Sequence, residues 1–358
     1  MIEFPKLGLK FAIDRVAFQV FGIDIFWYGI IIAFGFLLAV LLAMKNSKKF
    51  GIEPENIIDL VLIAVPVSIV LARLYYVLFN WSEFSDNILS VFNTRRGGLA
   101  IYGGIIGAFL SAYFFARWKK IGVLKLFDLG VPYLVLAQAI GRWGNFVNQE
   151  AFGTNTTLPW GMTGDSIKMQ LYSMRENLGM DVTPDLPVHP TFLYESLLNF
   201  LIFIFLILYR KKRKLEGGVF FLYMILYGIG RAFIEGIRTD SLMLGNFRVS
   251  QALGIILAIT FTAVFIIRRK KAAEISAEEV VELGASSYGT VLRELEQKES
   301  VDNTETDNNN DSSTDVPNDN HTPESDEYTG NNAGNDKSEA DIGTGVESKD
   351  IINEDGKK

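Results

Sequence analysis

The chain has 358 residues, of which 49% are hydrophobic. It contains no cysteine and only two histidines, which excludes a disulfide scaffold, a cysteine-ligated metal site and a catalytic thiol supplied by this chain, and argues against a histidine-rich metal centre. The formal charge of −7 averages two unlike parts, because residues 1–271 carry 28 Lys and Arg against 18 Asp and Glu, whereas residues 272–358 carry 6 against 23.

Seven predominantly apolar stretches follow one another within residues 1–271. They are residues 26–44, 57–79, 99–116, 121–141, 190–209, 218–237 and 249–267. Each is close to the ~20 residues with which an α-helix crosses a bilayer, and backbone groups inside a bilayer must be satisfied within the segment. The sequence therefore predicts an all-α integral membrane protein with seven transmembrane helices and an outer loop at about residues 146–188.

Basic clusters follow every second apolar stretch. They are Lys45, Lys48 and Lys49 after the first, Arg117, Lys119 and Lys120 after the third, residues 210–214 after the fifth and residues 268–271 after the seventh. Because cytoplasmic loops carry an excess of Lys and Arg, this alternation predicts that the N-terminus lies outside and the C-terminus inside. The clusters indicate attraction to a lipid bilayer, and no nucleic-acid-binding module accompanies them.

Two features predict local packing. The spacing Gly103-x-x-x-Gly107 is typical of two helices in close contact. The first twenty residues carry regularly spaced apolar side chains, and they could either form an interfacial helix on the outer face or dock onto the bundle. Both alternatives are open at this point.

Residues 272–358 are rich in Asn, Asp, Ser, Thr and Glu and include stretches without an apolar run, such as residues 302–319. Such a segment buries too little apolar surface to offset the loss of chain entropy on folding. We expect a membrane domain over residues 1–271 and an acidic, mostly disordered cytoplasmic tail over residues 272–358.

Charged and amide side chains within the apolar stretches gather near their predicted outer ends. They belong to the second and third stretches (Arg73, Arg95, Arg96, Tyr102), the end of the fourth (residues 141–150), the start of the fifth (His189, Glu195) and the end of the sixth (Tyr227, Arg231, Glu235, Arg238). An Arg at the middle of a bilayer costs roughly 2.5–3.5 kcal/mol on insertion scales, so these residues require partners or a function.

Helical spacing places several of these residues on shared faces. Tyr227, Arg231, Glu235 and Arg238 stand at i, i+4, i+8 and i+11, and Arg142, Asn145 and Gln149 stand at i, i+3 and i+7 if the helix continues that far. Two such arginine-bearing faces at one depth predict an anion site, because guanidinium groups bind phosphate oxygens through two parallel hydrogen bonds.

The alternative interpretation is a set of structural ion pairs. Arg231 could pair with Glu235, and Arg142 with Glu195 or Glu150. Arg73 and Asp59 lie ~21 Å apart along one helix and cannot pair with each other, so Arg73 is a secondary candidate. A transporter or receptor for an anionic ligand, or a structural lipid-binding protein, is also conceivable. A transporter would need a polar path through the inner halves of the helices, which are almost wholly apolar (for example residues 201–208).

Residues 141–153 resemble the signature of bacterial prolipoprotein diacylglyceryl transferases, Gly-Arg-x-Gly-Asn-Phe-apolar-Asn-x-Glu-x-x-Gly. Three further blocks resemble the same family over roughly residues 1–271, and the acidic tail lies outside the resemblance. They are Trp27-Tyr28-Gly29, His189-Pro190-Thr191-x-x-Tyr194-Glu195, and Tyr227-Gly-x-Gly-Arg231-x-x-x-Glu235 followed by Arg238.

The resemblance implies an enzyme of the bacterial plasma membrane whose active site faces the outer leaflet. Its substrates would be phosphatidylglycerol and a preprolipoprotein whose signal peptide carries a lipobox cysteine. The diacylglyceryl group would be transferred to the cysteine thiol, a thioether would form and glycerol 1-phosphate would leave, as the first step of lipoprotein maturation. No metal or organic cofactor is implied.

The resemblance also implies roles for individual residues. Arg142 would bind the lipid head group, Arg231 would act at the reacting phosphate, and Glu235 and Arg238 would orient or balance that pair. The other residues expected to line the substrate site are Asn145, Asn148, Glu150, Tyr28, Glu195, His189 and Tyr227.

This chain departs from the family pattern at Tyr102, where many members carry the histidine that is the usual candidate for the general base. A tyrosine, with an unperturbed pKa of about 10, is a poorer base at neutral pH. Tyr102, Glu150, Glu195 and His189 are all candidates for the proton acceptor, with Glu150 slightly preferred because it belongs to the signature.

Overall fold

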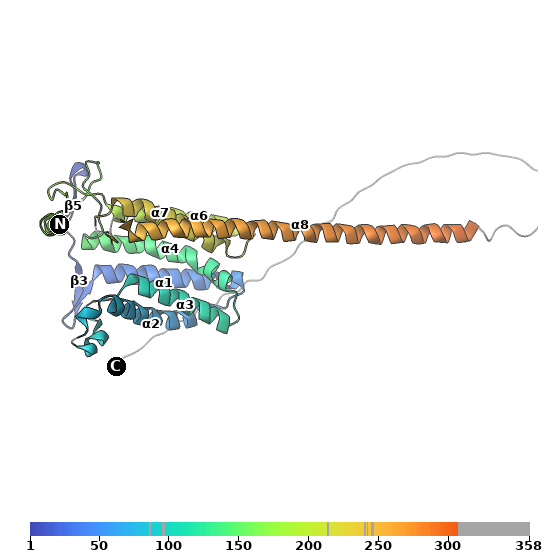
Figure 1. Ribbon diagram of the computed structural model, residues 1–358, viewed down its shortest axis with the longest axis horizontal. Coiled ribbons are helices and arrows are strands. Elements are labelled where there is room, and N and C mark those ends of the chain that lie inside the picture. Colours follow the sequence, from blue (N-terminus) through green and yellow to red (C-terminus); the bar gives the residue numbers. More distant parts are fainter. Residues whose placement is uncertain are drawn as a thin grey trace, which may run out of the picture. The chain divides into compact units, whose positions relative to one another are not determined.

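The computed structural model describes residues 1–85, 87–94, 97–212, 215–239, 241, 243–244 and 247–306. Arg95, Arg96 and residues 213–214 of the basic cluster lie outside the described residues, as do residues 307–358 of the predicted tail. The described chain is mostly helical (Figure 1). Residues Met1–Ser287 form one compact unit, to which all the contacts below belong.

Eight α-helices make up most of the described chain. They are α1 (Trp27–Ser47), α2 (Pro54–Phe79), α3 (Ile101–Trp118), α4 (Val123–Asn148), α5 (Asp165–Leu178), α6 (Thr191–Lys211), α7 (Gly218–Ile237) and α8 (Val249–Thr306). Short 3₁₀ turns lie between α1 and α2, namely η2 (Lys48–Phe50), and between α2 and α3, namely η3 (Trp81–Glu83) and η4 (Ile88–Phe92). Another, η1 (Pro5–Leu7), lies in the N-terminal segment before α1.

Six of these helices are long and apolar enough to cross a membrane: α1, α2, α4, α6, α7 and the part of α8 from Val249 to Ile275. These six correspond to six of the seven predicted spans, as expected of a multi-pass membrane protein. The remaining predicted span, residues 99–116, forms α3, which is shorter and has three glycines and an arginine within its 18 residues. A seventh span therefore stays a prediction.

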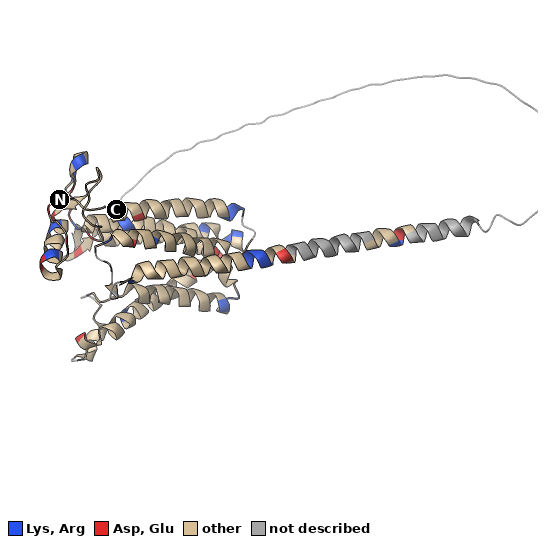
Figure 2. Cartoon of the chain, turned by 45° about the horizontal axis from the view of Figure 1, so that its top comes forward, with Lys and Arg blue, Asp and Glu red and all other residues tan. Residues whose placement is uncertain are grey.

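Lys and Arg recur at the helix ends farthest from the N-terminus and on one stretch inside α8, and others lie close to the N-terminus (Figure 2). This distribution agrees with the alternation of the basic clusters along the sequence. The predicted boundary between residues 271 and 272 lies inside α8, and residues 272–306 are helical. These residues include strong helix formers such as Ala, Glu and Leu, and the expectation of a mostly disordered tail over residues 272–358 stays a prediction.

Helix α4 lies at the centre of the bundle and packs against α1, α6 and α7. Its N-terminal half carries Asp128, which is fully buried and accepts hydrogen bonds from the backbone N–H groups of Gly217 and Phe220, both at 2.9 Å. These bonds satisfy orphan donors at the start of α7, whose positive dipole end also favours a carboxylate. Asp128 therefore fixes α7 against α4 far from the residues of the predicted site.

Three small sheets add β-structure that the all-α prediction omitted. Strands β1 (Ile2–Phe4), β2 (Leu9–Phe11) and β5 (Thr163–Gly164) form an antiparallel sheet in the order β2-β1-β5. Strands β3 (Val16–Val20) and β4 (Ile23–Phe26) pair as a hairpin, and β6 (Met243–Leu244) pairs with β7 (Phe247–Arg248). Strands of two to five residues give too short a period-two pattern to stand out in the sequence.

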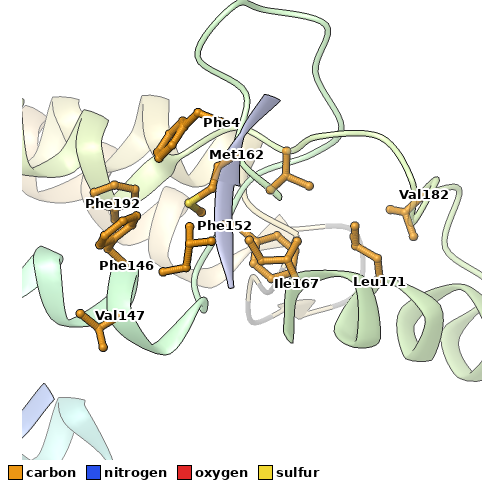
Figure 3. Close-up of a cluster of buried hydrophobic side chains, with 11 residues drawn as sticks. Phe4, Phe146, Val147, Phe152, Met162, Ile167, Leu171, Val182 and Phe192 are labelled. Atoms are coloured by element: carbon orange, nitrogen blue, oxygen red, sulfur yellow. The ribbon is translucent and has the colours of Figure 1, made fainter. Parts of the chain in front are cut away.

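The N-terminal segment docks onto the bundle and does not form an interfacial helix. Ile2 pairs with Phe11 and with Gly164, and Ile2 and Phe4 belong to a buried apolar cluster at one end of the bundle (Figure 3). That cluster comprises Ile2, Phe4, Phe146, Val147, Phe152, Met162, Ile167, Leu171, Val182, Val188 and Phe192. It joins the end of α4, the start of α6 and the predicted outer loop, which contains β5 and α5.

Glycines set the distance between α2 and α3, as the predicted packing motif requires. A Cβ on Gly107 would lie 2.7 Å from the Cα of Ser68, and one on Gly103 would lie 2.8 Å from the Cα of Ala72. A Cβ on Gly104, by contrast, would meet its nearest neighbour, the Cβ of Ala72, at an ordinary 3.8 Å. Two of the three glycines on this helix start are therefore in contact with the backbone of α2.

Replacing Gly107 with Ala is expected to lower the free energy of unfolding by about 1–3 kcal/mol, because the added methyl group forces α3 away from α2. Replacing Gly104 with Ala is the matched control and should change stability little. Thermal unfolding of the two purified variants in the same detergent measures the difference. Equal melting temperatures for both variants would contradict the close contact at Gly107.

Candidate active site

The end of α4 brings residues 141–150 against α1 and α6. Gly144 lies against the ring of Tyr28 on α1, where a Cβ would be 2.8 Å from Cδ2 of that ring. On α6, the hydroxyl of Ser196 accepts a hydrogen bond from the indole nitrogen of Trp143 at 3.2 Å. Gly144 therefore allows the close approach of α1, and Trp143 turns toward α6.

Gln149 does not share the face of Arg142 and Asn145, contrary to the predicted spacing. Helix α4 ends at Asn148, and Gln149 takes a left-handed conformation with φ 54°. Its buried side chain accepts a hydrogen bond from the backbone N–H of Ser166 on α5 at 3.1 Å. Gln149 thus closes the helix and ties it to the outer loop.

Three arginines and two glutamates from α4, α6 and the end of α7 form one charged cluster. An Nη atom of Arg142 lies 2.6 Å from Glu195, and an Nη atom of Arg231 lies 2.6 Å from Glu235. Glu195 also contacts Arg231 at 3.4 Å and Arg238 at 3.3 Å. We call these five residues the arginine–glutamate cluster. The two predicted ion pairs, Arg231 with Glu235 and Arg142 with Glu195, both form.

The two carboxylates of this cluster are buried, and the arginines are partly accessible. Glu195 is 4% exposed and Glu235 1% exposed, whereas the side chains of Arg142, Arg231 and Arg238 are 21%, 18% and 11% exposed. Three guanidinium groups against two carboxylates leave a formal charge of +1 within the cluster. A partly accessible, net positive cluster in surroundings of low dielectric favours an anionic ligand.

The signature carboxylate Glu150 is held by the amides of the same motif. Its Oε1 accepts hydrogen bonds from Asn145 at 2.9 Å and from Asn148 at 3.4 Å. The side-chain oxygen of Asn145 lies 3.4 Å from an Nη atom of Arg142. Asn145 therefore links Glu150 to the arginine–glutamate cluster, and the signature residues predicted to line one site do come together.

Tyr102 connects α3 to the start of α8. Its hydroxyl is 3.0 Å from that of Ser250, and Arg248, two residues earlier, donates a hydrogen bond to the backbone carbonyl of Glu235. Tyr102 is thus joined through the beginning of α8 to the helix that carries Arg231. Sequence reasoning did not find Ser250 or Arg248, because neither falls in a motif that it recognised.

His189 belongs to an adjacent hydrogen-bonded group. Its Nδ1 lies 3.1 Å from the hydroxyl of Tyr194, which also accepts a hydrogen bond from the indole of Trp160 at 2.7 Å. Burial lowers the pKa of His189 below its ordinary value, so the neutral imidazole is favoured at physiological pH. The contacts of this histidine are those of a residue that orders the start of α6.

Tyr227 lies one turn before Arg231 on α7 and stacks on Tyr223, with ring centroids 5.4 Å apart. The hydroxyl of Tyr223 is hydrogen-bonded to the amide of Gln138 on α4, at 3.1 Å from its nitrogen. Gln138 and Tyr223 therefore form a polar contact between α4 and α7, on the N-terminal side of Arg142 and Arg231 along those helices. Gln138 and Tyr223 were not predicted, although Gln138 stands one turn before Arg142.

Two grooves flank α1 next to the site. One, of about 560 Å³, is almost wholly apolar and reaches Trp143 and Ser196, the neighbours in sequence of Arg142 and Glu195. The other, of about 550 Å³, includes Tyr28 and Asn148. Both grooves therefore adjoin residues of the predicted site, one on each side of the same helix.

Replacing Glu195 with Gln is expected to lower the free energy of unfolding by about 3–5 kcal/mol, because the variant leaves three buried or half-buried arginines around a neutral amide. The control is Asp59→Asn, which breaks the exposed Lys119–Asp59 pair at 2.8 Å and should cost about 0–1 kcal/mol. Thermal unfolding in detergent compares the two. A Glu195→Gln protein that melts with the wild type would refute the central role of this carboxylate.

Comparison with known proteins identifies the family. A family model described as prolipoprotein diacylglyceryl transferase matches residues 15–267. A protein of Clostridioides difficile (strain 630), named phosphatidylglycerol–prolipoprotein diacylglyceryl transferase, is 49% identical over 243 residues, which cover 68% of this chain and 90% of the relative.

Two further relatives carry the same name. The protein of Finegoldia magna is 47% identical over 247 residues, covering 69% of this chain and 92% of the relative. That of Bacillus cereus (strain G9842) is 44% identical over 268 residues, covering 74% and 95%. These matches take in the signature, the arginine–glutamate cluster and most of the helical bundle, and the chain belongs to the prolipoprotein diacylglyceryl transferase family.

Proposed function

We propose that the chain transfers the diacylglyceryl group of phosphatidylglycerol to the thiol of a lipobox cysteine in a preprolipoprotein. The names of its relatives support the donor lipid and the protein acceptor. The observation that carries the proposal is the arginine–glutamate cluster, because its excess positive charge suits the phosphodiester of phosphatidylglycerol. The sulfur comes from the substrate, so an enzyme without cysteine can carry out the reaction.

The reaction forms a carbon–sulfur bond and breaks a carbon–oxygen bond. The thiolate attacks the carbon of the diacylglyceryl group that bears the phosphate, a thioether forms, and glycerol 1-phosphate leaves with the electron pair of the broken carbon–oxygen bond. Negative charge grows on the departing phosphate, where fixed guanidinium groups stabilise it. In our assignment Arg142 binds the head group and Arg231 stabilises the leaving phosphate.

The glutamates of the cluster hold these guanidinium groups in place before the lipid binds. Glu195 contacts all three arginines, and Glu235 contacts Arg231 at 2.6 Å. A group that is already oriented pays no reorganisation cost when charge develops, which is why such preorganisation stabilises transition states. We assign Glu195, Glu235 and Arg238 to this positioning role.

The thiol proton requires an acceptor, and we assign it to Glu150. Two amide donors fix this carboxylate, and Asn145 links it to Arg142. The hydroxyl of Tyr102 is engaged with that of Ser250 at 3.0 Å. His189 is hydrogen-bonded to Tyr194 in the adjacent group and is assigned an ordering role.

The grooves beside α1 suit a reaction with two membrane-borne substrates. The apolar groove next to Trp143 fits the acyl chains of the lipid, and the groove with Tyr28 and Asn148 offers polar groups to a peptide. This division keeps the lipid phosphate close to Arg142. The peptide would then approach from the side of Glu150, which Asn148 contacts.

We further propose seven spans in the bacterial plasma membrane, with the N-terminus and the site toward the outer leaflet and the C-terminal tail in the cytoplasm. The alternation of basic clusters supports this orientation. In it, α3 is the remaining span, and residues 1–271 are the catalytic domain.

Arg142→Lys and Arg231→Lys are each expected to lower kcat by about 100-fold or more, because an ammonium replaces a planar fork of donors. Arg175→Lys on the exposed face of α5 is the control and should keep full activity. The assay is mass spectrometry of a lipobox peptide incubated with phosphatidylglycerol and the protein. Failure of the intact wild-type protein to add a diacylglyceryl mass would overturn the proposed function.

Glu150→Gln is expected to lower kcat by about 100-fold to 10,000-fold in the same assay, because the amide cannot accept the thiol proton. Tyr102→Phe should retain most activity, since it loses only the hydrogen bond to Ser250. The reverse pattern, an active Glu150→Gln protein and an inactive Tyr102→Phe protein, would transfer the role of base to Tyr102.

A further inference from the structure

Arg73 is a buried arginine near the end of α2 that the proposed reaction does not use. It is 8% exposed, and its guanidinium donates five hydrogen bonds of 2.7–3.1 Å to backbone carbonyls. The acceptors are Ser90, Val91, Asn93, Gly97 and Gly98. All five lie in the connection between α2 and α3, so one side chain binds most of that connection to the bundle.

The contacts around Arg73 are close and specific. Its guanidinium lies 5.0 Å from the ring centre of buried Phe84, within the range of a cation–π interaction. Gly98 has φ +77°, and a Cβ there would clash with Nη1 of Arg73. The backbone N–H of Ala100 also donates to the carbonyl of Ala72, at 3.0 Å. The connection is therefore shaped around the guanidinium.

The same connection also carries large apolar side chains that are exposed. Trp81 of η3 is 54% exposed, and Ile88, Leu89 and Phe92 of η4 are 64%, 78% and 81% exposed. We call these four residues the η3–η4 apolar surface. Large exposed apolar residues also stand at the end of α2 and at the start of α3, namely Phe79 and Ile101.

This surface lies at the end of the bundle that carries the arginine–glutamate cluster. Tyr102 at the start of α3 contacts Ser250, and Arg248 binds the carbonyl of Glu235, so the start of α3 and the end of α7 share one end (Figure 1). Its residues adjoin the faces of α2 and α3 that would meet lipid. Aromatic residues, and Trp above all, favour the interface between head groups and acyl chains.

We propose that the η3–η4 apolar surface inserts into the head-group region of the membrane and that Arg73 is the residue that holds it in the inserting shape. Insertion buries side chains that would otherwise be exposed to water, as in an interfacial segment that lies in the plane of the bilayer. The five carbonyls bound by Arg73 would otherwise need water or other donors at that depth. This inference does not depend on the reaction that the site catalyses.

The test exploits the absence of native cysteine, which allows single cysteines to be labelled with an environment-sensitive fluorophore in the full chain. Phe92→Cys and Leu89→Cys report on the surface, Leu62→Cys on the lipid-facing side of α2, and Glu176→Cys on exposed α5. The protein is reconstituted into phosphatidylglycerol–phosphatidylethanolamine vesicles. Quenching by lipid that carries a nitroxide near the head group is compared with quenching by an aqueous nickel chelate.

Labels at positions 89 and 92 should be quenched by the shallow nitroxide lipid at least about twofold more than the label at position 176, and less by nickel. Nickel quenching at 92 equal to that at 176 would overturn the insertion. Protection of position 92 from both quenchers would also overturn it, because protein would then cover the surface.

Arg73→Gln should reduce nitroxide quenching at position 92 while leaving that at position 62 unchanged, and Arg73→Lys should not restore it, because an ammonium has three donors in place of five. Gly98→Ala, which disturbs the same contact from the other side, provides a second variant if Arg73→Gln does not fold. Wild-type quenching at 92 in the folded variants would overturn the role of Arg73.

Discussion

The site depends on one buried carboxylate, that of Glu195, among three guanidinium groups. Removing a charged carboxylate from water costs several kcal/mol unless opposite charges compensate for it, and here Arg142, Arg231 and Arg238 do so from two neighbouring chain segments. The same contacts hold the arginines in place. The cluster as a whole keeps a net positive charge, because it has three guanidinium groups and two carboxylates. In the proposed function, stability and lipid binding are therefore coupled, because Glu195 both compensates the buried charges and orients the arginines.

This arrangement arises because the helix ends that carry the charged residues lie together at one end of the bundle. Helix α4 is central, and Gly144 lets Tyr28 of α1 approach its last turns closely. At the opposite end, Asp128 binds the backbone at the start of α7 and so sets its position relative to α4. The helices that carry the glutamates and arginines are thus held in place by contacts that lie outside the charged cluster.

Arginine has two different uses in this chain. In the arginine–glutamate cluster the guanidinium groups face carboxylates and keep a charge that an anion can share. Arg73 instead donates hydrogen bonds to backbone carbonyls of the connection between α2 and α3, so this residue stabilises the structure of that connection. The difference follows from the groups that each arginine contacts. The carboxylates of the cluster compete with a phosphate for the guanidinium donors, whereas the connection between α2 and α3 encloses the donors of Arg73. Burial makes both uses effective, because little water competes with the hydrogen bonds there.

The sequence by itself determined the membrane class and the family, and it predicted the residues of the candidate site, because hydropathy and a long signature are local properties of the chain. It identified Arg142, Arg231, Glu195 and Glu235, but it left the ion pairs and the anion site as alternatives. Only the tertiary structure decided that the pairs form within one cluster, since pairing between α4, α6 and α7 depends on how helices pack. It also corrected Gln149, whose left-handed backbone ends α4, and the N-terminal segment, whose short strands find partners in distant residues. Such contacts join residues far apart in the chain, and no local pattern encodes them.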